Sequence, residues 1–278
     1  MMMRVIGVAG VLAAASAVVA ETRIYEVEIV PTWSNATHPG AFPGNAHFSW
    51  FGGGVHSDAA SFWSVGTPAS PGVKQMAETG VTTILVETEV RAAVTAGTAL
   101  SEINQTYWFC PPETSSGSCG PLTFEIEVSD AFPLVTLASM LGPSPDWFVG
   151  VSGLSLRDGE GWASELTIDL RPYDAGTRSN NHTFNLFGPL NSPPEPVSLI
   201  TEKDAQIITG ASLGSMIFRL VTPACAADFN SDGMIDSTDL ASLLAFWEQA
   251  GETDLNGDGT TDSGDLAMVL AGWGACAG

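Results

Sequence analysis

The sequence predicts a mainly β protein: an antiparallel β-sandwich over residues 21–222, followed by a small all-α C-terminal module over 223–278. Two observations predict the sandwich, namely short β-branched or alternating segments and the Gly, Pro, Ser and Asp clusters between them. A third observation predicts the module. An acidic motif occurs twice near the end of the chain, and apolar residues at helical spacing follow each copy.

The charge of the chain limits its partners. The 278 residues include 31 acidic and 9 basic side chains, and the formal net charge is −22. A protein this acidic is a poor partner for nucleic acids or anionic membranes, because like charges repel. Cations are the expected counterpart.

The first 20 residues have the features of a secretory signal peptide. A single early charge, Arg4, precedes an apolar run that ends in small residues at the spacing a signal peptidase reads, Val18 and Ala20. We expect cleavage after Ala20, which makes the mature protein a secreted one. An uncleaved membrane anchor is the alternative, but the run is short and rich in Ala and Gly.

Six segments are expected to be strands of the sandwich, because β-branched or alternating residues dominate them. In chain order they are RIYEVEIV (23–30), VTTILVETEV (81–90), LTFEIEV (122–128), PLVTLASML (133–141), ELTIDL (165–170) and SMIFRLV (215–221). A helical turn is expected only near 72–79.

Four cysteines suit an oxidising compartment outside the cytoplasm. Cys110 and Cys119 flank a turn-forming loop, and Cys225 and Cys276 bracket the acidic tail. Of the three possible pairings, we expect Cys110–Cys119 and Cys225–Cys276, because each stays within one unit. Closing the tail would stabilise it by about 4 kcal/mol in the chain-entropy treatment. A zinc site is the alternative, but the usual paired-cysteine spacing is missing.

The repeated acidic motif fits a calcium loop. Such a loop of twelve residues offers oxygen ligands at positions 1, 3, 5, 7, 9 and 12 and has glycine at position 6. In the first copy these ligands are Asp228, Asn230, Asp232, the carbonyl of Met234, Asp236 and Asp239. In the second copy they are Asp254, Asn256, Asp258, the carbonyl of Thr260, Asp262 and Asp265. The glycines are Gly233 and Gly259.

An apolar stripe at helical spacing follows each loop. The stripes are Leu240, Leu243, Leu244 and Trp247, then Leu266, Val269, Leu270 and Trp273. We expect the two stripes to pack together once the loops are ordered. The crowded carboxylates repel one another without a cation, so Ca²⁺ is expected to help fold the module.

Both loops end in Asp rather than the Glu of the common calcium loop. This departure and the doubled loop–helix unit over 225–278 resemble the type I dockerin module. The resemblance implies docking to a cohesin-like protein or a cell-surface scaffold, with loop positions 10 and 11 helping to select the partner. These are Ser237-Thr238 and Ser263-Gly264, which differ and so argue against symmetric docking. A plain solvated acidic tail, or a calcium-binding module without a cohesin partner, are the alternatives.

Several stretches across about 23–200 resemble the spondin N-terminal domain of F-spondin-like matrix proteins. They include TWSNATHPGAFP, SPDWFVGVSGLSL and GWASELTIDLRPYDAGT. The resemblance implies an antiparallel β-sandwich that contacts an extracellular protein or other matrix ligand, and it implies no catalytic chemistry.

The spondin resemblance also implies a third calcium site, at Asp146 and Asp174. The family's third ligand position holds Arg178 here, and a guanidinium cannot ligate a cation. Asn180 or Asn181 could complete the site. Alternatively, the two aspartates pair with Arg178 in a salt bridge that needs no metal.

The expected function is a secreted calcium-binding adhesion or matrix-interaction protein. The alternative is a polysaccharide-active or carbohydrate-binding component of a dockerin-assembled complex. Trp33, Trp50, Trp63 and Trp147 could stack on sugars, although filling the core and the strand ends is the favoured explanation.

No catalytic set of residues stands out in the sequence, and the protein is not expected to be an enzyme. Ser212 lies in a G-x-S-x-G pattern, but a strand pattern follows where a nucleophile elbow needs a helix. Glu165 and Asp169 are too far apart along a strand to act as a glycosidase pair. His38 and His56 are expected to form structural hydrogen bonds.

Overall fold

The structure of the protein is a computed structural model. It describes residues 22–107, 109–111, 113–114, 122–159, 161–179, 184, 186, 188–201, 212–221, 225–256 and 258–276. The expected signal peptide, Cys119, Asn180 and Asn181 lie outside these ranges. Within them, no helix is long and apolar enough to cross a membrane.

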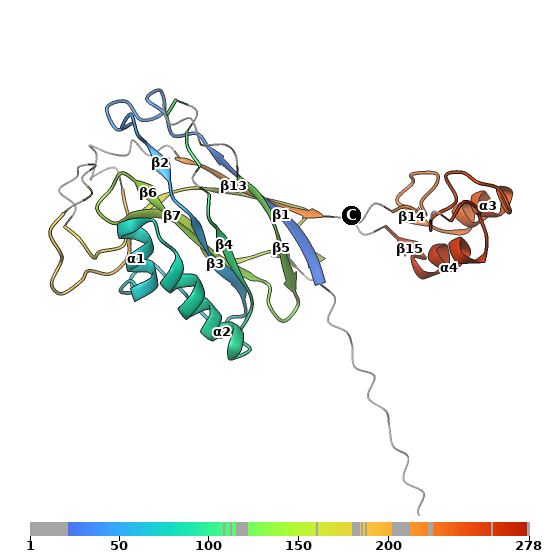
Figure 1. Cartoon of the computed structure of the whole chain (residues 1–278), viewed down its shortest axis with the longest axis horizontal. Helices are drawn as coiled ribbons and strands as arrows, with labels where there is room; N and C mark the ends of the chain where they lie inside the picture. The colour runs from blue at the N-terminus through green and yellow to red at the C-terminus, as the bar shows by residue number, and fades with distance from the viewer. Residues whose placement is uncertain are drawn as a thin grey trace, which may run out of the picture.

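Two antiparallel sheets form the body of the protein (Figure 1). The four-stranded sheet has the order β10-β13-β1-β5, with strands Glu165–Asp169, Gly214–Val221, Thr22–Pro31 and Leu122–Ser129. The larger sheet has the order β12-β11-β7-β6-β3-β4, with strands Ser198–Leu199, Pro172–Asp174, Trp147–Ser155, Leu134–Gly142, Phe51–His56 and Ala99–Gln105. β2 (His47–Phe48) adds to β6, and β8 (Arg157–Asp158) pairs with β9 (Gly161–Trp162).

The main core lies between the two sheets. In β1 the side chains of Tyr25, Val27 and Ile29 are fully buried, and Glu26 and Glu28 between them are partly exposed. This alternation is what a half-buried strand requires, because successive side chains point to opposite faces. The prediction of an antiparallel β-sandwich is therefore confirmed.

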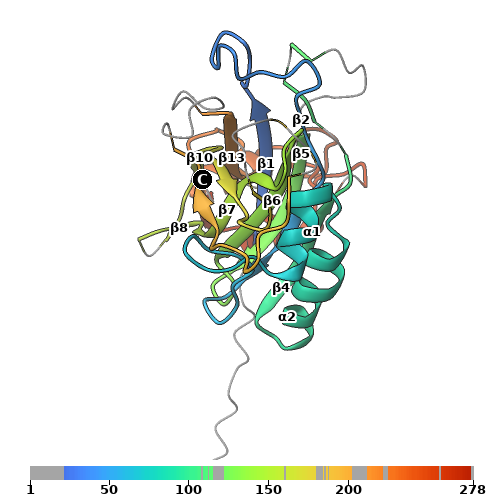
Figure 2. The same ribbon diagram turned by 90° about the vertical axis from the view of Figure 1, so that its left-hand side faces the viewer.

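Helices cover the outer face of the larger sheet (Figure 2). α1 (Pro71–Thr79) begins at the Ser70 cap, whose hydroxyl accepts the N–H of Val73, and ends at Gly80 with φ of 75°. Proline at the first helical position and glycine in the left-handed region are the usual helix boundaries. The turn expected near 72–79 is confirmed as this helix.

The expected strand over 81–90 is wrong, because the segment is helical. η1 (Leu85–Val90) is a π-helix that runs into α2 (Arg91–Thr95). The buried residues of this helix, Leu85, Val86 and Val90, continue a helical spacing that starts at Thr82 just before it, and they pack against the outer face of the larger sheet. The β-branched composition suggested a strand, but burial along one helical face decided the conformation.

The C-terminal unit holds α3 (Ser237–Ala245) and α4 (Ser263–Ala271), together with a short ribbon of β14 (Met234–Ile235) and β15 (Gly274–Ala275). The ribbon was not expected in an all-α module. The core consists of Ala227, Ile235, Leu243 and Val269. Of the predicted stripes, Leu243 and Val269 are buried, whereas Leu244 and Leu270 on the helices and Trp273 beyond the end of α4 are about half exposed.

Candidate functional site

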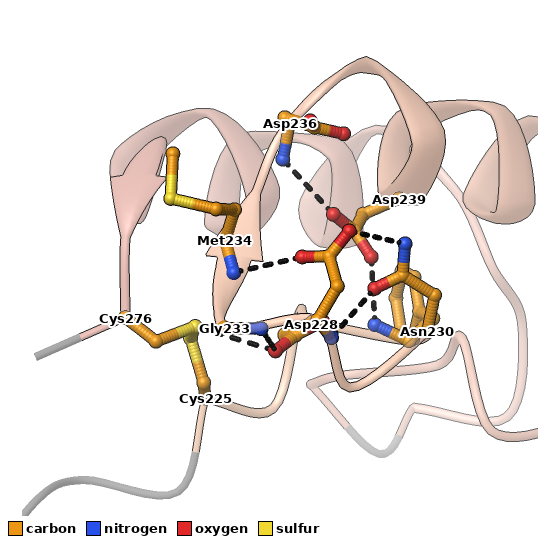
Figure 3. Close-up of a disulfide and its surroundings, with 10 residues drawn as sticks. Cys225, Asp228, Asn230, Gly233, Met234, Asp236, Asp239 and Cys276 are labelled. Carbon is orange, nitrogen blue, oxygen red and sulfur yellow. Dashed lines mark hydrogen bonds between the residues drawn. A yellow bond between two sulfur atoms is a disulfide. The ribbon is translucent and has the colours of Figure 1, made fainter. Parts of the chain in front are cut away.

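The first acidic loop is shaped by bonds from backbone N–H groups to its own side chains (Figure 3). Asp228 accepts the N–H groups of Asp232 at 3.2 Å and Gly233 at 2.9 Å. Asn230 accepts the N–H of Asp232 at 3.0 Å, and Asp232 accepts the N–H of Met234 at 2.9 Å. Oxygen atoms at loop positions 1, 3 and 5 therefore gather around one turn.

The second loop repeats these bonds 26 residues later. Asp254 accepts the N–H groups of Asp258 at 3.2 Å and Gly259 at 2.8 Å. Asn256 accepts the N–H of Asp258 at 2.9 Å, and Asp258 accepts the N–H of Thr260 at 3.0 Å. The sequence repeat is thus a repeat of conformation as well.

The glycine at position 6 of each loop has a backbone conformation that other residues avoid. The φ angle is 87° at Gly233 and 99° at Gly259. An L side chain costs roughly 1–2 kcal/mol in this left-handed region. Glycine therefore sets the sharp turn between positions 5 and 7.

Positions 9 and 12 of each loop join it to the following helix. Asp236 and Asp262 cap α3 and α4, and Asp239 and Asp265 complete capping boxes with them. Asp239, which is fully buried, accepts the N–H groups of Phe229 at 2.8 Å and Asp236 at 2.9 Å. In the second loop, the N–H of Asp262 is the main cause that lowers the pKa of the Asp265 carboxyl.

The donor set of both loops fits calcium. Carboxylate, amide and carbonyl oxygens are the ligands that Ca²⁺ prefers, and each loop offers them at all six ligand positions. Residues 225–278 contain ten acidic side chains and no Lys or Arg, so the segment itself supplies no cationic side chain to neutralise them. A bound divalent cation would neutralise part of this negative charge.

The positions that resemble dockerin recognition residues lie at the helix starts. Ser237, Thr238 and Ser263 are exposed, whereas Gly264 is half-buried. A Cβ added at Gly264 would lie 2.8 Å from the side-chain amide nitrogen of Asn256, the end of a flexible side chain.

The disulfide between Cys225 and Cys276 confirms one predicted pairing. Their sulfur atoms lie near a carboxylate oxygen of Asp228, but sulfurs joined in a disulfide offer no thiolate, so the zinc alternative fails here. Cys110 is also disulfide-bonded, and its predicted partner Cys119 lies outside the described residues.

In the sandwich, Asp174 of β11 pairs with Trp147 of β7, so Asp146 and Asp174 lie on adjacent segments, and the Asp174 carboxylate accepts the N–H of Gly176 at 2.7 Å. One carboxylate oxygen of Asp146 accepts the backbone N–H groups of Thr177 at 2.7 Å and Arg178 at 2.8 Å. Its other oxygen is buried and has no hydrogen-bond partner in the described part of the chain. Burial raises the pKa of Asp146, and the hydrogen bonds it accepts oppose the shift.

The side chain of Arg178 does not bind Asp146 as the salt-bridge alternative expected. Its guanidinium donates to Glu78 at 2.8 Å and to the carbonyl of Gly188 at 2.9 Å. Glu78 also accepts the hydroxyl of Thr177 at 2.8 Å. Glu78 is about 100 residues away in sequence, and nothing in the local pattern pointed to it.

The tryptophans do not support sugar stacking. Trp33 and Trp147 are fully buried, Trp63 is nearly so, and Trp50 is partly buried. Sugar-binding aromatic rings must be open to solvent on one face, so the first three are core residues. They pack against Phe42, Phe48, Phe148, Tyr173 and Phe184.

The residues considered for catalysis have structural roles. Ser212 precedes strand β13 rather than a helix, so it is not on a nucleophile elbow. His56 is buried and bonds to the carbonyl of Ser57 and the hydroxyl of Thr136, both at 2.7 Å. His38 is buried and bonds to the hydroxyl of Thr37 at 2.9 Å.

Known proteins share the sandwich. The family model of the spondin N-terminal domain (Spondin_N) matches residues 23–208, and the chain therefore belongs to this family. It is 35% identical to human Spondin-2 over 180 residues, which is 64% of this chain and 52% of that protein. It is 34% identical to rat Spondin-1 over 185 residues, 66% of this chain and 22% of that protein.

The chain thus spans about half the length of Spondin-2 and about a fifth of Spondin-1. Spondin-domain proteins are secreted proteins of the extracellular matrix, so the expected extracellular location is confirmed. The match ends before the two acidic loops.

Proposed function

We propose that the protein is a secreted, calcium-binding adhesion or matrix-interaction protein. Its spondin sandwich contacts an extracellular partner, and its C-terminal unit docks the protein to a cohesin-type partner or a cell-surface scaffold. The observation that carries the proposal is the pair of matching oxygen-lined loops in a segment without Lys or Arg.

Each loop would hold one Ca²⁺ ion through side-chain oxygens and one carbonyl. The first ion would bind Asp228, Asn230, Asp232, Met234, Asp236 and Asp239, and the second would bind their counterparts. The ion supplies the positive charge that the crowded carboxylates need. The protein's part is to fix the turn at Gly233 and Gly259 and to anchor each loop on the following helix.

A third ion in the sandwich is a separate part of the proposal. The buried oxygen of Asp146, which has no hydrogen-bond partner among the described residues, supports it, since a buried carboxylate oxygen usually has a partner. The guanidinium of Arg178 donates to Glu78 and to the carbonyl of Gly188, so it does not take the place of an ion beside Asp146.

Calcium titration of the full chain by calorimetry tests these sites. Wild-type protein should bind two ions in the C-terminal unit, and Asp228→Ala/Asp254→Ala should lose both, since position 1 anchors each loop. Asp58→Ala, which changes an exposed carboxylate far from the loops in sequence, is the matched control. A stoichiometry that is equal in wild type and in the double variant would sink the proposal for the tail.

The sandwich site has its own variant. Asp146→Asn should lower the total stoichiometry by one while the two tail ions remain. If the number of bound ions is the same with and without this substitution, the sandwich holds none.

Docking is tested on immobilised cohesin domains. Calcium-loaded protein should bind, and Ser237→Arg/Thr238→Arg, which alters exposed positions of the first copy, should weaken binding more than Ser263→Arg. If the protein binds calcium but the immobilised cohesin domains do not capture it, the C-terminal unit is a compact calcium-binding unit without a cohesin partner. Turnover of a polysaccharide in a reducing-sugar assay would contradict the non-enzymatic assignment.

A further inference from the structure

The C-terminal unit is built from two halves of 26 residues, 225–250 and 251–276, whose positions correspond one to one. The N–H of Asp228 donates to the carbonyl of Cys225 at 2.8 Å, and the N–H of Asp254 donates to the carbonyl of Gly251 at 3.1 Å. Each half therefore starts with the same turn into its acidic loop.

In each half, the acidic loop forms backbone hydrogen bonds with residues near the end of the other half. Ile235 of the first loop pairs with Gly274, which follows α4. The corresponding residue of the second loop, Thr261, bonds to Glu248 at 2.9 Å and to Gln249 at 2.8 Å, which follow α3. The two halves are thus related by an exchange, as in a molecule with two-fold symmetry.

The two junctions between the halves differ in covalent chemistry. The first half ends at Ala250, and a peptide bond joins it to Gly251. The residues that correspond to Ala250 and Gly251 at the other junction are Cys276 and Cys225. These two residues are joined by the disulfide, with their Cα atoms 5.8 Å apart.

We propose that the Cys225–Cys276 disulfide replaces this missing peptide link, closes the two halves into a covalent ring, and holds the first acidic loop in its calcium-binding shape. The inference rests on the proposed calcium binding. In this proposal the disulfide controls the calcium affinity of one of the two loops.

The contacts of the disulfide connect it to the first loop directly. The carbonyl of Cys225 accepts the N–H of Asp228, at loop position 1, and the N–H of Cys276 donates to the carbonyl of Gly233, at position 6, at 2.9 Å. The Cys276 sulfur also lies 3.5 Å from a carboxylate oxygen of Asp228. The corresponding turn before Asp254 is held by Gly251 within the continuous chain.

Loss of the disulfide should therefore affect the two calcium loops unequally. In full-length Cys225→Ser/Cys276→Ser protein, we expect one tail ion to bind roughly 10- to 100-fold more weakly, as for other residues that orient metal ligands. The other ion should bind as before. Calorimetry with Ca²⁺ alone measures both affinities.

Two backgrounds assign the weakened site. In Asp254→Ala protein only the first loop can bind, and the serine pair should weaken that ion. In Asp228→Ala protein only the second loop can bind, and the serine pair should change its affinity little. Equal weakening in both backgrounds would overturn the proposal, because it would mean that the disulfide stabilises the unit without favouring a loop.

Amide hydrogen exchange in calcium-free protein tests whether the disulfide holds the first loop. In the serine pair, exchange of the Asp232 and Gly233 amides should speed up, while exchange of the Asp258 and Gly259 amides should change little. If wild-type protein binds no Ca²⁺ in the tail, the proposed function fails, and this readout still decides the ring closure. Unchanged exchange in the first loop would refute it.

A cut at the other junction is the matched control. A protease site inserted between Ala250 and Gly251, both exposed, can be cleaved while the disulfide stays intact. The ring proposal expects the mirror-image result: faster exchange at Asp258 and Gly259, and an unchanged first loop. Disturbance of the first loop by this cut would contradict the equivalence of the two junctions.

Discussion

At the scale of single residues, Tyr25 shows how a polar atom is placed in the sandwich core. Its side chain is fully buried, and its hydroxyl donates to the carbonyl of Ala163 at 2.6 Å and lies 3.3 Å from that of Leu156. These carbonyls stand on either side of the β8–β9 hairpin. Burial raises the pKa of Tyr25 to about 12, against the opposing charges of Arg23 and Arg157.

This pKa predicts an alkaline limit to stability. The folded protein favours the neutral phenol, so the contribution of Tyr25 is complete below about pH 10, the pKa of an unburied tyrosine. It should be lost as the pH rises through about 12, the value in the fold. Urea unfolding from pH 8 to 12.5 measures it, and Tyr25→Phe should remove this part of the pH dependence. An identical alkaline loss in that variant would show that other groups cause it.

Gly53 allows β3 and β6 to approach closely. A Cβ atom added at this position would collide with the backbone carbonyl of Thr136 in β6. Gly53→Ala should therefore destabilise the sandwich by about 1–3 kcal/mol or more, as overpacked sites do. Urea unfolding checks this against Gly44→Ala, where a Cβ meets open space. Equal midpoints for the two variants would contradict the steric account.

At the scale of elements, the segment over 81–90 distinguishes the burial pattern of a strand from that of a helix. As a strand, Leu85 and Glu87 would share one face, because side chains alternate. As a helix, Leu85 and Val86 turn toward the sheet and Glu87 toward solvent. The structure has the helical arrangement, and it buries the outer face of the larger sheet.

Substitution of these two residues tests the helix. Leu85→Ala should lower the free energy of unfolding by about 2–5 kcal/mol, the usual cost of emptying a packed site. Glu87→Ala, at an exposed position, should change it by less than about 0.5 kcal/mol. Comparable losses in both variants would favour a buried strand over the helix.

At the scale of the whole molecule, the sandwich and the C-terminal unit have separate cores and separate sources of stability. The sandwich buries a large cluster of aromatic and aliphatic side chains between its sheets. The C-terminal unit is drawn in orange and red in Figure 1 and has a core of four buried residues. The unit also contains one disulfide and ten acidic side chains. So small a core usually needs a cross-link or a metal.

Calcium should therefore act on one part of the molecule more than on the other. Calorimetric unfolding of the full chain is expected to show a transition of the C-terminal unit that a chelator lowers or abolishes, while the sandwich stays folded. At a free Ca²⁺ concentration 100 times the dissociation constant, one ion stabilises its site by about 2.7 kcal/mol. Asp228→Ala/Asp254→Ala should abolish the calcium shift of this transition, and a shift that persists in the variant would contradict it.

The sequence by itself determined the features that depend on neighbours along the chain. Alternation in β1 and β5 predicted their strands, and the ligand spacing of the two acidic loops predicted their matching shape, because all the groups involved lie within one short segment. The Cys225–Cys276 pair followed from its position around a single unit.

Only the tertiary structure decided the features that depend on distant partners. Packing against the outer face of the larger sheet favours a helix rather than a strand in the segment 81–90. The tertiary structure also buries Trp33 and Trp147 and places Glu78 beside Arg178. It also set Cys225 and Cys276 at the junction that corresponds to Ala250 and Gly251. Burial and long-range pairing depend on which surfaces meet in space, and a local pattern of residue types does not contain that information.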